Sequence, residues 1–92
     1  MVDETVGRRI PIPIIVCDDI AAMHAWLARV FGLSPGRLEH DAEGRCVHGE
    51  LQAGDGAIWL HQVSPHFGLT SPKTLGATTG ITAVMVEDVD AH

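Results

Sequence analysis

The sequence has few positive charges and few aromatic side chains, and it contains no tyrosine. Six Lys and Arg residues stand against twelve Asp and Glu residues, which gives a formal net charge of -6 at pH 7. The basic residues are scattered along the chain, so no basic stripe is available to neutralise the phosphates of a nucleic acid. This composition argues against a nucleic-acid partner.

Long apolar runs and cysteine motifs are also missing. No stretch approaches the roughly 18 apolar residues of a membrane span, and the N-terminus lacks the apolar core of a signal peptide. The two cysteines, Cys17 and Cys46, have no CxxC spacing and fit small, buried, reduced thiols. We therefore expect a cytoplasmic protein with no membrane partner.

What is present is the composition of one small globular domain. The chain has 92 residues, of which 46% are hydrophobic and 20% are charged. Such a composition is typical of a folded soluble protein, but a chain of this length has a thin core. We expect a single α+β unit that gains stability by association.

The N-terminal third predicts a strand followed by a helix. Residues 1–9 are polar and predict a flexible arm. Residues 10–16 are β-branched and apolar, but Pro11 and Pro13 cannot donate to a sheet ladder, so pairing is expected only from Ile14.

The next segment is the clearest helix of the chain. Residues 20–31 carry apolar side chains at a spacing of three and four, with Asp18 or Asp19 as the N-cap and Gly32 as the C-terminal stop.

Trp26 and three of the histidines are interpreted as structural or solvent-exposed residues and not as ligands. Trp26 belongs to the apolar stripe of the helix and is expected in the core, whereas His24 lies at its margin and is expected to be partly exposed. His40 and His66 lie in or beside loops and are expected in solvent.

The strongest local signal is a β-hairpin over residues 45–63. Two alternating runs flank Gly54-Asp55-Gly56, which is typical hairpin-turn chemistry. One face of the hairpin is nearly all apolar, with Val47, Gly49, Leu51, Ala53, Ile58, Leu60 and Gln62. The other face carries His48, Glu50, Gln52, Trp59 and His61.

The loop length decides how the polar face of the hairpin is paired. His48 opposes either His61 or Val63, and Glu50 opposes either Trp59 or His61. Either register brings two imidazoles, a carboxylate and an indole together. Three interpretations stay open: pocket lining or solvated surface, which we favour because such residues are common on sheet faces, a small-molecule contact, or a three-ligand metal site.

The remaining segments complete the order of elements. Residues 34–36 predict a turn, residues 37–40 a short strand, and residues 41–44 the turn of a second hairpin. Residues 64–79 predict a connector loop, and residues 80–92 a strand to Val86 followed by a helix start with Asp88 and Asp90 as capping candidates. The tail thereby repeats the strand, acidic cap and helix start of the N-terminal third.

Three stretches together resemble the glyoxalase/bleomycin-resistance/extradiol-dioxygenase fold, the vicinal oxygen chelate superfamily. They are IIVCDDIAAMHAWLARVFGL, DAEGRCVHGELQAGDGAIWL and GITAVMVEDVDAH. The resemblance implies a first βαβββ module over residues 10–63, the connector over 64–79, and the opening of an incomplete second module over 80–92. It also implies a mixed, cupped sheet with the helix on its outer face and a pocket inside the cup.

The resemblance further implies where a metal would bind in this superfamily. The matching positions are Ile12 on the first strand, Trp59 on the fourth, and Ile81 on the first strand of the second module, with the last position beyond His92. None of the three side chains has a metal-binding atom. The expected protein is therefore a metal-free, cofactor-free domain that sequesters a small, flat or aromatic ligand, with Trp59, His48, Glu50 and His61 lining the site.

Two alternatives to that function stay open at this point. One is a metal-dependent lyase or dioxygenase of the same superfamily that uses His48, Glu50 or His61, and the other is a truncated, non-catalytic remnant. An unfinished second module leaves a strand edge and apolar surface uncovered. We therefore expect a homodimer that pairs or swaps the strand from Gly80 to Val86.

Overall fold

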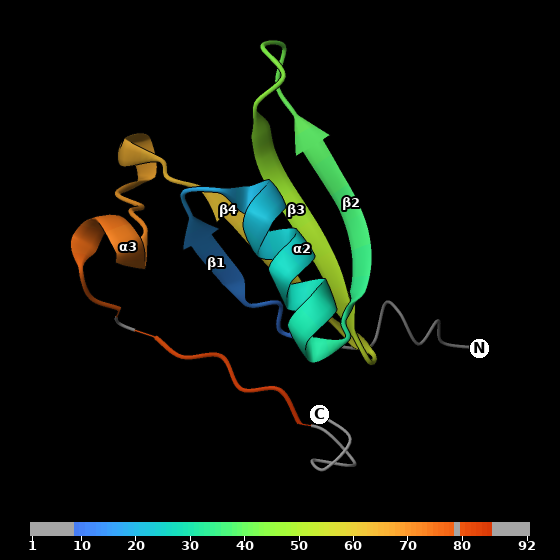
Figure 1. The fold of residues 1–92 in the computed structure, drawn as a ribbon. Helices are drawn as coiled ribbons and strands as arrows, with labels where there is room; N and C mark the ends of the chain where they lie inside the picture. The colour runs from blue at the N-terminus through green and yellow to red at the C-terminus, as the bar shows by residue number, and fades with distance from the viewer. Residues whose placement is uncertain (1–8, 79, 86–92) are drawn as a thin grey trace.

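The chain forms an α+β fold with one four-stranded mixed sheet and one main helix, as expected (Figure 1). The computed structural model describes residues 9–78 and 80–85. In chain order the elements are β1 (Ile14–Cys17), α2 (Ile20–Phe31), β2 (Ser34–His40), β3 (Cys46–Ala53), β4 (Gly56–Gln62), the 3-10 helix η1 (Pro65–Phe67) and α3 (Pro72–Leu75). The strand order is β1-β4-β3-β2, with β1 parallel to β4 and the other pairs antiparallel. No helix in the described ranges is long and apolar enough to cross a membrane.

Helix α2 begins and ends where its sequence predicts. The side chain of Asp19 accepts a hydrogen bond from the Ala22 N–H at 3.0 Å and so caps the first turn. Gly32 ends the helix with φ at 68°, a left-handed conformation that glycine adopts without a Cβ penalty. The helix lies over one face of the sheet and contacts β2, β3 and β4 (Figure 1).

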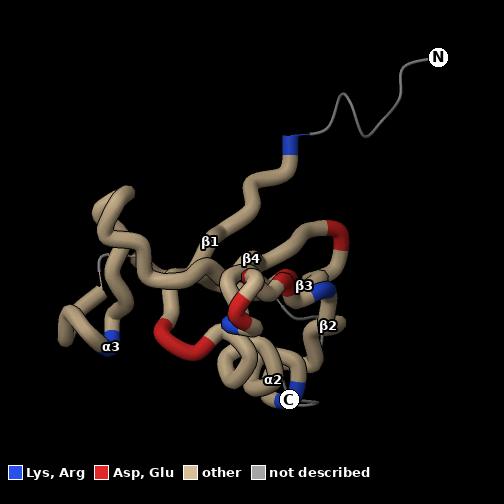
Figure 2. The backbone as a smooth tube through the Cα atoms, turned by 90° about the horizontal axis from the view of Figure 1, so that it is seen from above, with Lys and Arg blue, Asp and Glu red and all other residues tan. Residues whose placement is uncertain are grey.

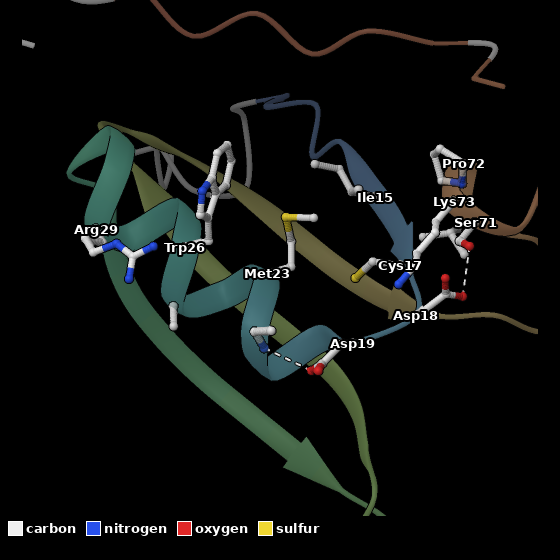
Figure 3. Close-up of a pocket in the computed structure, with 13 residues that line it drawn as sticks. Ile15, Cys17, Asp18, Asp19, Met23, Trp26, Arg29, Ser71, Pro72 and Lys73 are labelled. Atoms are coloured by element: carbon white, nitrogen blue, oxygen red, sulfur yellow. Dashed lines mark hydrogen bonds between the residues drawn. The ribbon is translucent and has the colours of Figure 1, made fainter. Parts of the chain in front are cut away.

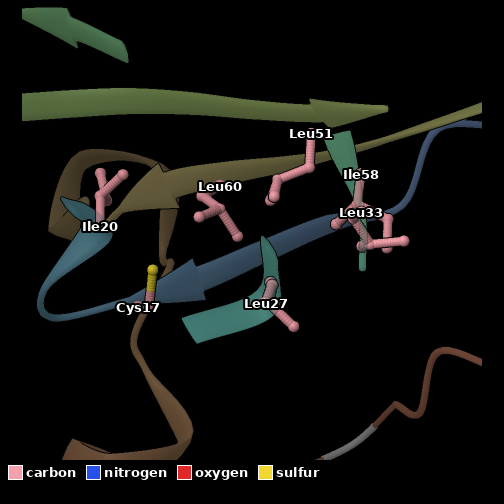
Figure 4. Packing of buried hydrophobic residues seen from close by; sticks show 7 residues of the cluster. All are labelled: Cys17, Ile20, Leu27, Leu33, Leu51, Ile58 and Leu60. Carbon is pink, nitrogen blue, oxygen red and sulfur yellow. The ribbon is translucent and has the colours of Figure 1, made fainter. Parts of the chain in front are cut away.

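The hairpin of β3 and β4 supplies the centre of the core. Its register pairs Ala53 with Gly56 across a two-residue turn, which selects the first of the two registers that the sequence allows. The apolar face of the hairpin packs under α2, as the alternation predicts. The buried apolar residues are Cys17, Ile20, Leu27, Leu33, Leu51, Ile58 and Leu60 (Figure 4).

Strand β2 is longer than its sequence suggests, and the predicted turn at residues 34–36 is wrong. The strand begins at Ser34, and its register shifts between Pro35 and Leu38, so that Gly36 and Arg37 form a bulge opposite Glu50. A proline is tolerated here because β2 is an edge strand. A Cβ at Gly36 would lie 2.8 Å from the Glu50 carbonyl oxygen, so only glycine fits this approach.

The two expectations for aromatic residues of α2 are both wrong. His24 is buried, with 8% of its surface exposed, and its Nε2 lies 3.1 Å from the Gly36 carbonyl oxygen and 2.9 Å from that of Glu50. Trp26 is 43% exposed and packs edge-on against the ring of Phe31. The spacing of apolar residues predicts which side of a helix faces the sheet. How far the sheet extends beyond the helix decides which residues at the edges of that side are buried.

The connector is more ordered than a plain loop, and it is fastened to the end of β1. The Ser71 hydroxyl is buried, donates a hydrogen bond to Asp18 at 2.8 Å, and also caps α3 by accepting from the Thr74 N–H. Asp18 therefore anchors the connector, and Asp19 alone caps α2. The two cysteines are free thiols, Cys17 buried and Cys46 half-buried.

The strand expected over residues 80–86 is not formed in the described residues 80–85, which are exposed and have no strand pairing. The β1 edge they would join is separated from them by a gap lined by Ile14, Ile15 and Ile81. Val86, the helix start at 88–92 and the arm at 1–8 lie outside the described residues.

Candidate functional site on the open sheet face

The candidate site lies on the sheet face opposite α2, which we call the open face. The registers place its side chains in two rows that cross the sheet. One row contains Ile14, Trp59 and Glu50, and the other contains Val16, His61, His48 and Glu39. The structure thus puts all four sequence-predicted site residues, His48, Glu50, Trp59 and His61, on one face of neighbouring strands.

The hydrogen-bond pattern brings the cross-strand partners within each row close together. The Trp59 N–H donates to the Pro13 carbonyl oxygen at 3.0 Å, so its backbone faces β1 and not β3. Glu50 and Trp59 therefore form a non-hydrogen-bonded pair, the kind whose side chains approach more closely. The His48 and His61 pair, two residues along each strand, has the same geometry.

His48 and Glu50 form the polar centre of the open face. His48 Nε2 and Glu50 Oε2 are 2.8 Å apart, and both side chains are mostly shielded from solvent, with 18% and 26% exposed. Arg37 Nε lies 3.3 Å from the same carboxylate oxygen, and Arg37 also pairs with Glu39. The bulge in β2 is what carries Arg37 to Glu50, so this contact depends on the close approach at Gly36.

Trp59 supplies the aromatic part of the site. Its ring meets that of His48 edge to face, with centroids 5.3 Å apart and an interplanar angle of 77°. Ile14 stands beside Trp59 on β1 and is 55% exposed. A hydrogen-bonding imidazole and carboxylate thus border an apolar surface, an arrangement suited to a planar ligand that carries a few polar groups.

A shallow hollow adjoins this cluster at the hairpin end of the open face. It has a volume of about 380 Å³, and Ile12, Glu50 and Gln52 contribute to its lining. This volume is within the range of small-molecule sites, roughly 300 to 1,000 Å³. Ile12, which the resemblance implies as a metal-ligand position, therefore lines the same hollow as Glu50.

His61 takes no part in the His48 and Glu50 contact. Its Nδ1 lies 2.7 Å from the Gln62 carbonyl oxygen, so the ring is held by the backbone of its own strand. In the described part of the chain, no group of three or more His, Cys, Asp or Glu side chains is arranged to hold a metal ion. Ile81, the third implied metal position, is 95% exposed in the unpaired segment.

The pKa of Glu50 is held below its ordinary value of 4.5, chiefly by the hydrogen bond to His48 and further by the charge of Arg37. A lowered folded-state pKa contributes stability above pH 4.5 that is lost as the pH falls through the lowered value. As the pH falls below 4.5, we expect the free energy of unfolding to decrease less for Glu50→Gln than for the parent chain. Urea unfolding at several pH values measures this difference. Glu43→Gln, at an exposed acid, is the control, and identical pH profiles for the parent and Glu50→Gln would contradict the interaction.

Sequence reasoning missed Arg37 and Glu39, which complete the polar network. Alternation along β2 would have placed them on the open face, but the Pro35-Gly36 pair reads locally as a turn. The described Lys and Arg residues lie on separate elements and form no stripe (Figure 2).

No protein-family model, curated protein or solved structure matches the chain.

Proposed function

We propose that this protein is a glyoxalase/bleomycin-resistance-type module whose open face binds a small, planar aromatic molecule without a metal, in the cytoplasm. The observation that carries the proposal is the contact of Trp59 with the hydrogen-bonded His48 and Glu50 pair. A mixed four-stranded sheet with the main helix on one face supports the proposal, because the resemblance implies a mixed sheet covered by one helix. Two carboxylates, Glu50 and Glu39, share one cation, Arg37, so the face has an excess of negative charge and a planar aromatic cation is the best suited ligand.

Proflavine, a planar aromatic cation, is a suitable probe for this site. We expect Trp59→Ala to weaken proflavine binding about tenfold, because an aromatic contact contributes roughly 0.5–1.5 kcal/mol. Titration calorimetry measures the effect, with Trp26→Ala as the matched control on the opposite side of the sheet. Binding that is unchanged in Trp59→Ala and lost in Trp26→Ala would contradict the assignment to the open face.

The same proposal states that the ligand binds without a metal ion. It is supported by the side chains at Ile12, Trp59 and Ile81, which have no metal-binding atoms, and by the backbone contact that holds His61. Metal analysis of protein purified without chelators provides the check. Stoichiometric zinc, nickel, manganese or iron would instead favour a lyase or dioxygenase of this superfamily.

We further propose that the chain forms a homodimer through the outer edge of β1. A gap of about 570 Å³ lies between that edge, the connector and residues 80–82. An uncovered edge with exposed Ile14 favours pairing with a second copy, by direct contact or by exchange of the segment from Gly80 to Val86. Size-exclusion chromatography with light scattering should show a dimer, and a monomer at every concentration would exclude it.

A further inference from the structure

The helix layer covers the sheet unevenly and leaves a hollow on the side of β1. Helix α2 contacts β2, β3 and β4, while β1 is contacted by the short α3. Between β1, α2 and α3 lies a hollow of about 890 Å³ (Figure 3). It lies on the opposite side of the sheet from the candidate site, and its volume also suits a small organic ligand.

The walls of this hollow are mainly apolar. Ile15 and Met23 face it from β1 and α2, and the half-exposed Trp26 stands at its rim (Figure 3). The Cys17 thiol also lines it, and burial, followed by the charges of Asp18 and Asp19, raises the pKa of this thiol to about 11. Cys17 is therefore a neutral, weakly polar part of the wall at physiological pH.

The charged residues around the hollow differ in how far they are already engaged. The Asp19 carboxylate accepts from the backbone of α2, and the Asp18 carboxylate accepts from the Ser71 and Thr74 hydroxyls. Across the described ranges, the side chains of Lys73 and Arg29 have no ion pair or hydrogen bond with another residue. Figure 3 shows the Lys73 side chain directed toward Cys17 and Asp18. Lys73 is therefore a cation of the wall whose side chain has no partner among the described residues, beside two carboxylates that already accept hydrogen bonds.

We propose that this hollow is a second binding site, for a small amphipathic organic anion. Its apolar body lies against Ile15, Met23 and Trp26, and its anionic group pairs with the Lys73 ammonium. The apolar lining suits the body of such a ligand, and the Lys73 ammonium, unpartnered in the described part of the chain, favours an anionic group over a neutral one. This site does not depend on the function proposed for the open face.

A matched pair of probes tests the charge requirement. Anilinonaphthalene sulfonate is an aromatic anion, and phenylnaphthylamine has nearly the same aromatic body without the sulfonate. We expect Lys73→Gln to weaken sulfonate binding about fivefold, the upper end for an exposed ion pair, and to leave phenylnaphthylamine binding unchanged. Lys73→Arg should retain sulfonate binding, and Arg9→Gln removes a cation outside the hollow as the control.

The two tryptophans report which site is occupied, because one belongs to each side of the sheet. In NMR spectra of the labelled full chain, sulfonate should move the indole signal of Trp26 and leave that of Trp59 in place. Trp26→Phe and Trp59→Phe assign the two signals, and circular dichroism verifies that both variants fold.

Three outcomes would overturn this second site. Movement of the Trp59 signal alone would place the anion on the open face, and equal effects of Lys73→Gln on both probes would remove the role of charge. A dimer that excludes the probe at rising protein concentration would show that a second copy covers the hollow. Failure of proflavine to bind the open face would leave the sulfonate result untouched, so the two proposals fail separately.

Discussion

Leu60→Ala is expected to lower the free energy of unfolding by about 3–5 kcal/mol, the upper range for a buried leucine. Leu60 is completely buried, with 0% of its surface exposed, and it lies in the core cluster with Ile20 and Leu51 (Figure 4). The loss combines the transfer free energy of the deleted atoms with the cavity that remains. A domain of this size has only about 5–15 kcal/mol of net stability, so much of the margin would be lost.

Urea unfolding followed by circular dichroism measures this loss. Leu75→Ala is the matched control, since Leu75 in α3 is 57% exposed and its truncation should change stability by less than about 0.5 kcal/mol. Equal effects of the two leucine substitutions would show that the core is not centred on the β3 and β4 hairpin.

His24→Ala is the second substitution with a large expected effect, about 2–3 kcal/mol of unfolding free energy. The backbone of Glu50 points toward β2, because the Trp59 N–H is directed to Pro13 on the far side of β4. At that position β2 bulges, and Gly36 and Arg37 together lie opposite Glu50. The single Nε2–H of His24 donates to both, and its removal leaves two partly buried carbonyls without that donor.

The same contact links the helix to the open face, because Glu50 carries the carboxylate of the candidate site. We therefore expect His24→Ala to weaken proflavine binding as well as stability, whereas His24→Gln, which retains an N–H donor, should recover part of both. His40→Ala is the matched control, an exposed histidine on the same sheet. Equal urea midpoints for His24→Ala and His40→Ala would contradict the proposed role of the buried imidazole.

Local patterns predicted most of the elements and the composition of the open face. The bounds of α2 follow from Asp19 and Gly32, which act within one turn of the helix ends. The division of the hairpin into an apolar and a polar face follows from strict alternation, so His48, Glu50, Trp59 and His61 were correctly placed together. Pro11 and Pro13 correctly limited β1 to pairing from Ile14.

The failures share a different cause, since each depends on a partner distant in sequence. Pro35-Gly36 by itself predicts a turn. In the structure these residues belong to a bulged edge strand, because β2 pairs with β3 on both sides of the bulge. The helical pattern places His24 at the edge of the apolar side and predicts partial exposure. The ring is buried because it binds two carbonyl oxygens at the bulge. The apolar spacing of α2 predicts Trp26 in the core because the apolar side of the helix is wide. In the structure α2 packs on β2, β3 and β4 and does not cover β1, so Trp26 stays half-exposed.

The sequence by itself determined the helix, the hairpin and which side chains share each face, because these follow from periodicity and capping between near neighbours. Only the tertiary structure decided how Arg37 reaches Glu50, how His24 holds the bulge, and where the hollow beside β1 opens. These features arise where separate elements meet, and their geometry is set by the register of β2 on β3 and the width of α2 across the sheet. No single segment carries that information, since each contact becomes favourable only after both partners are in place.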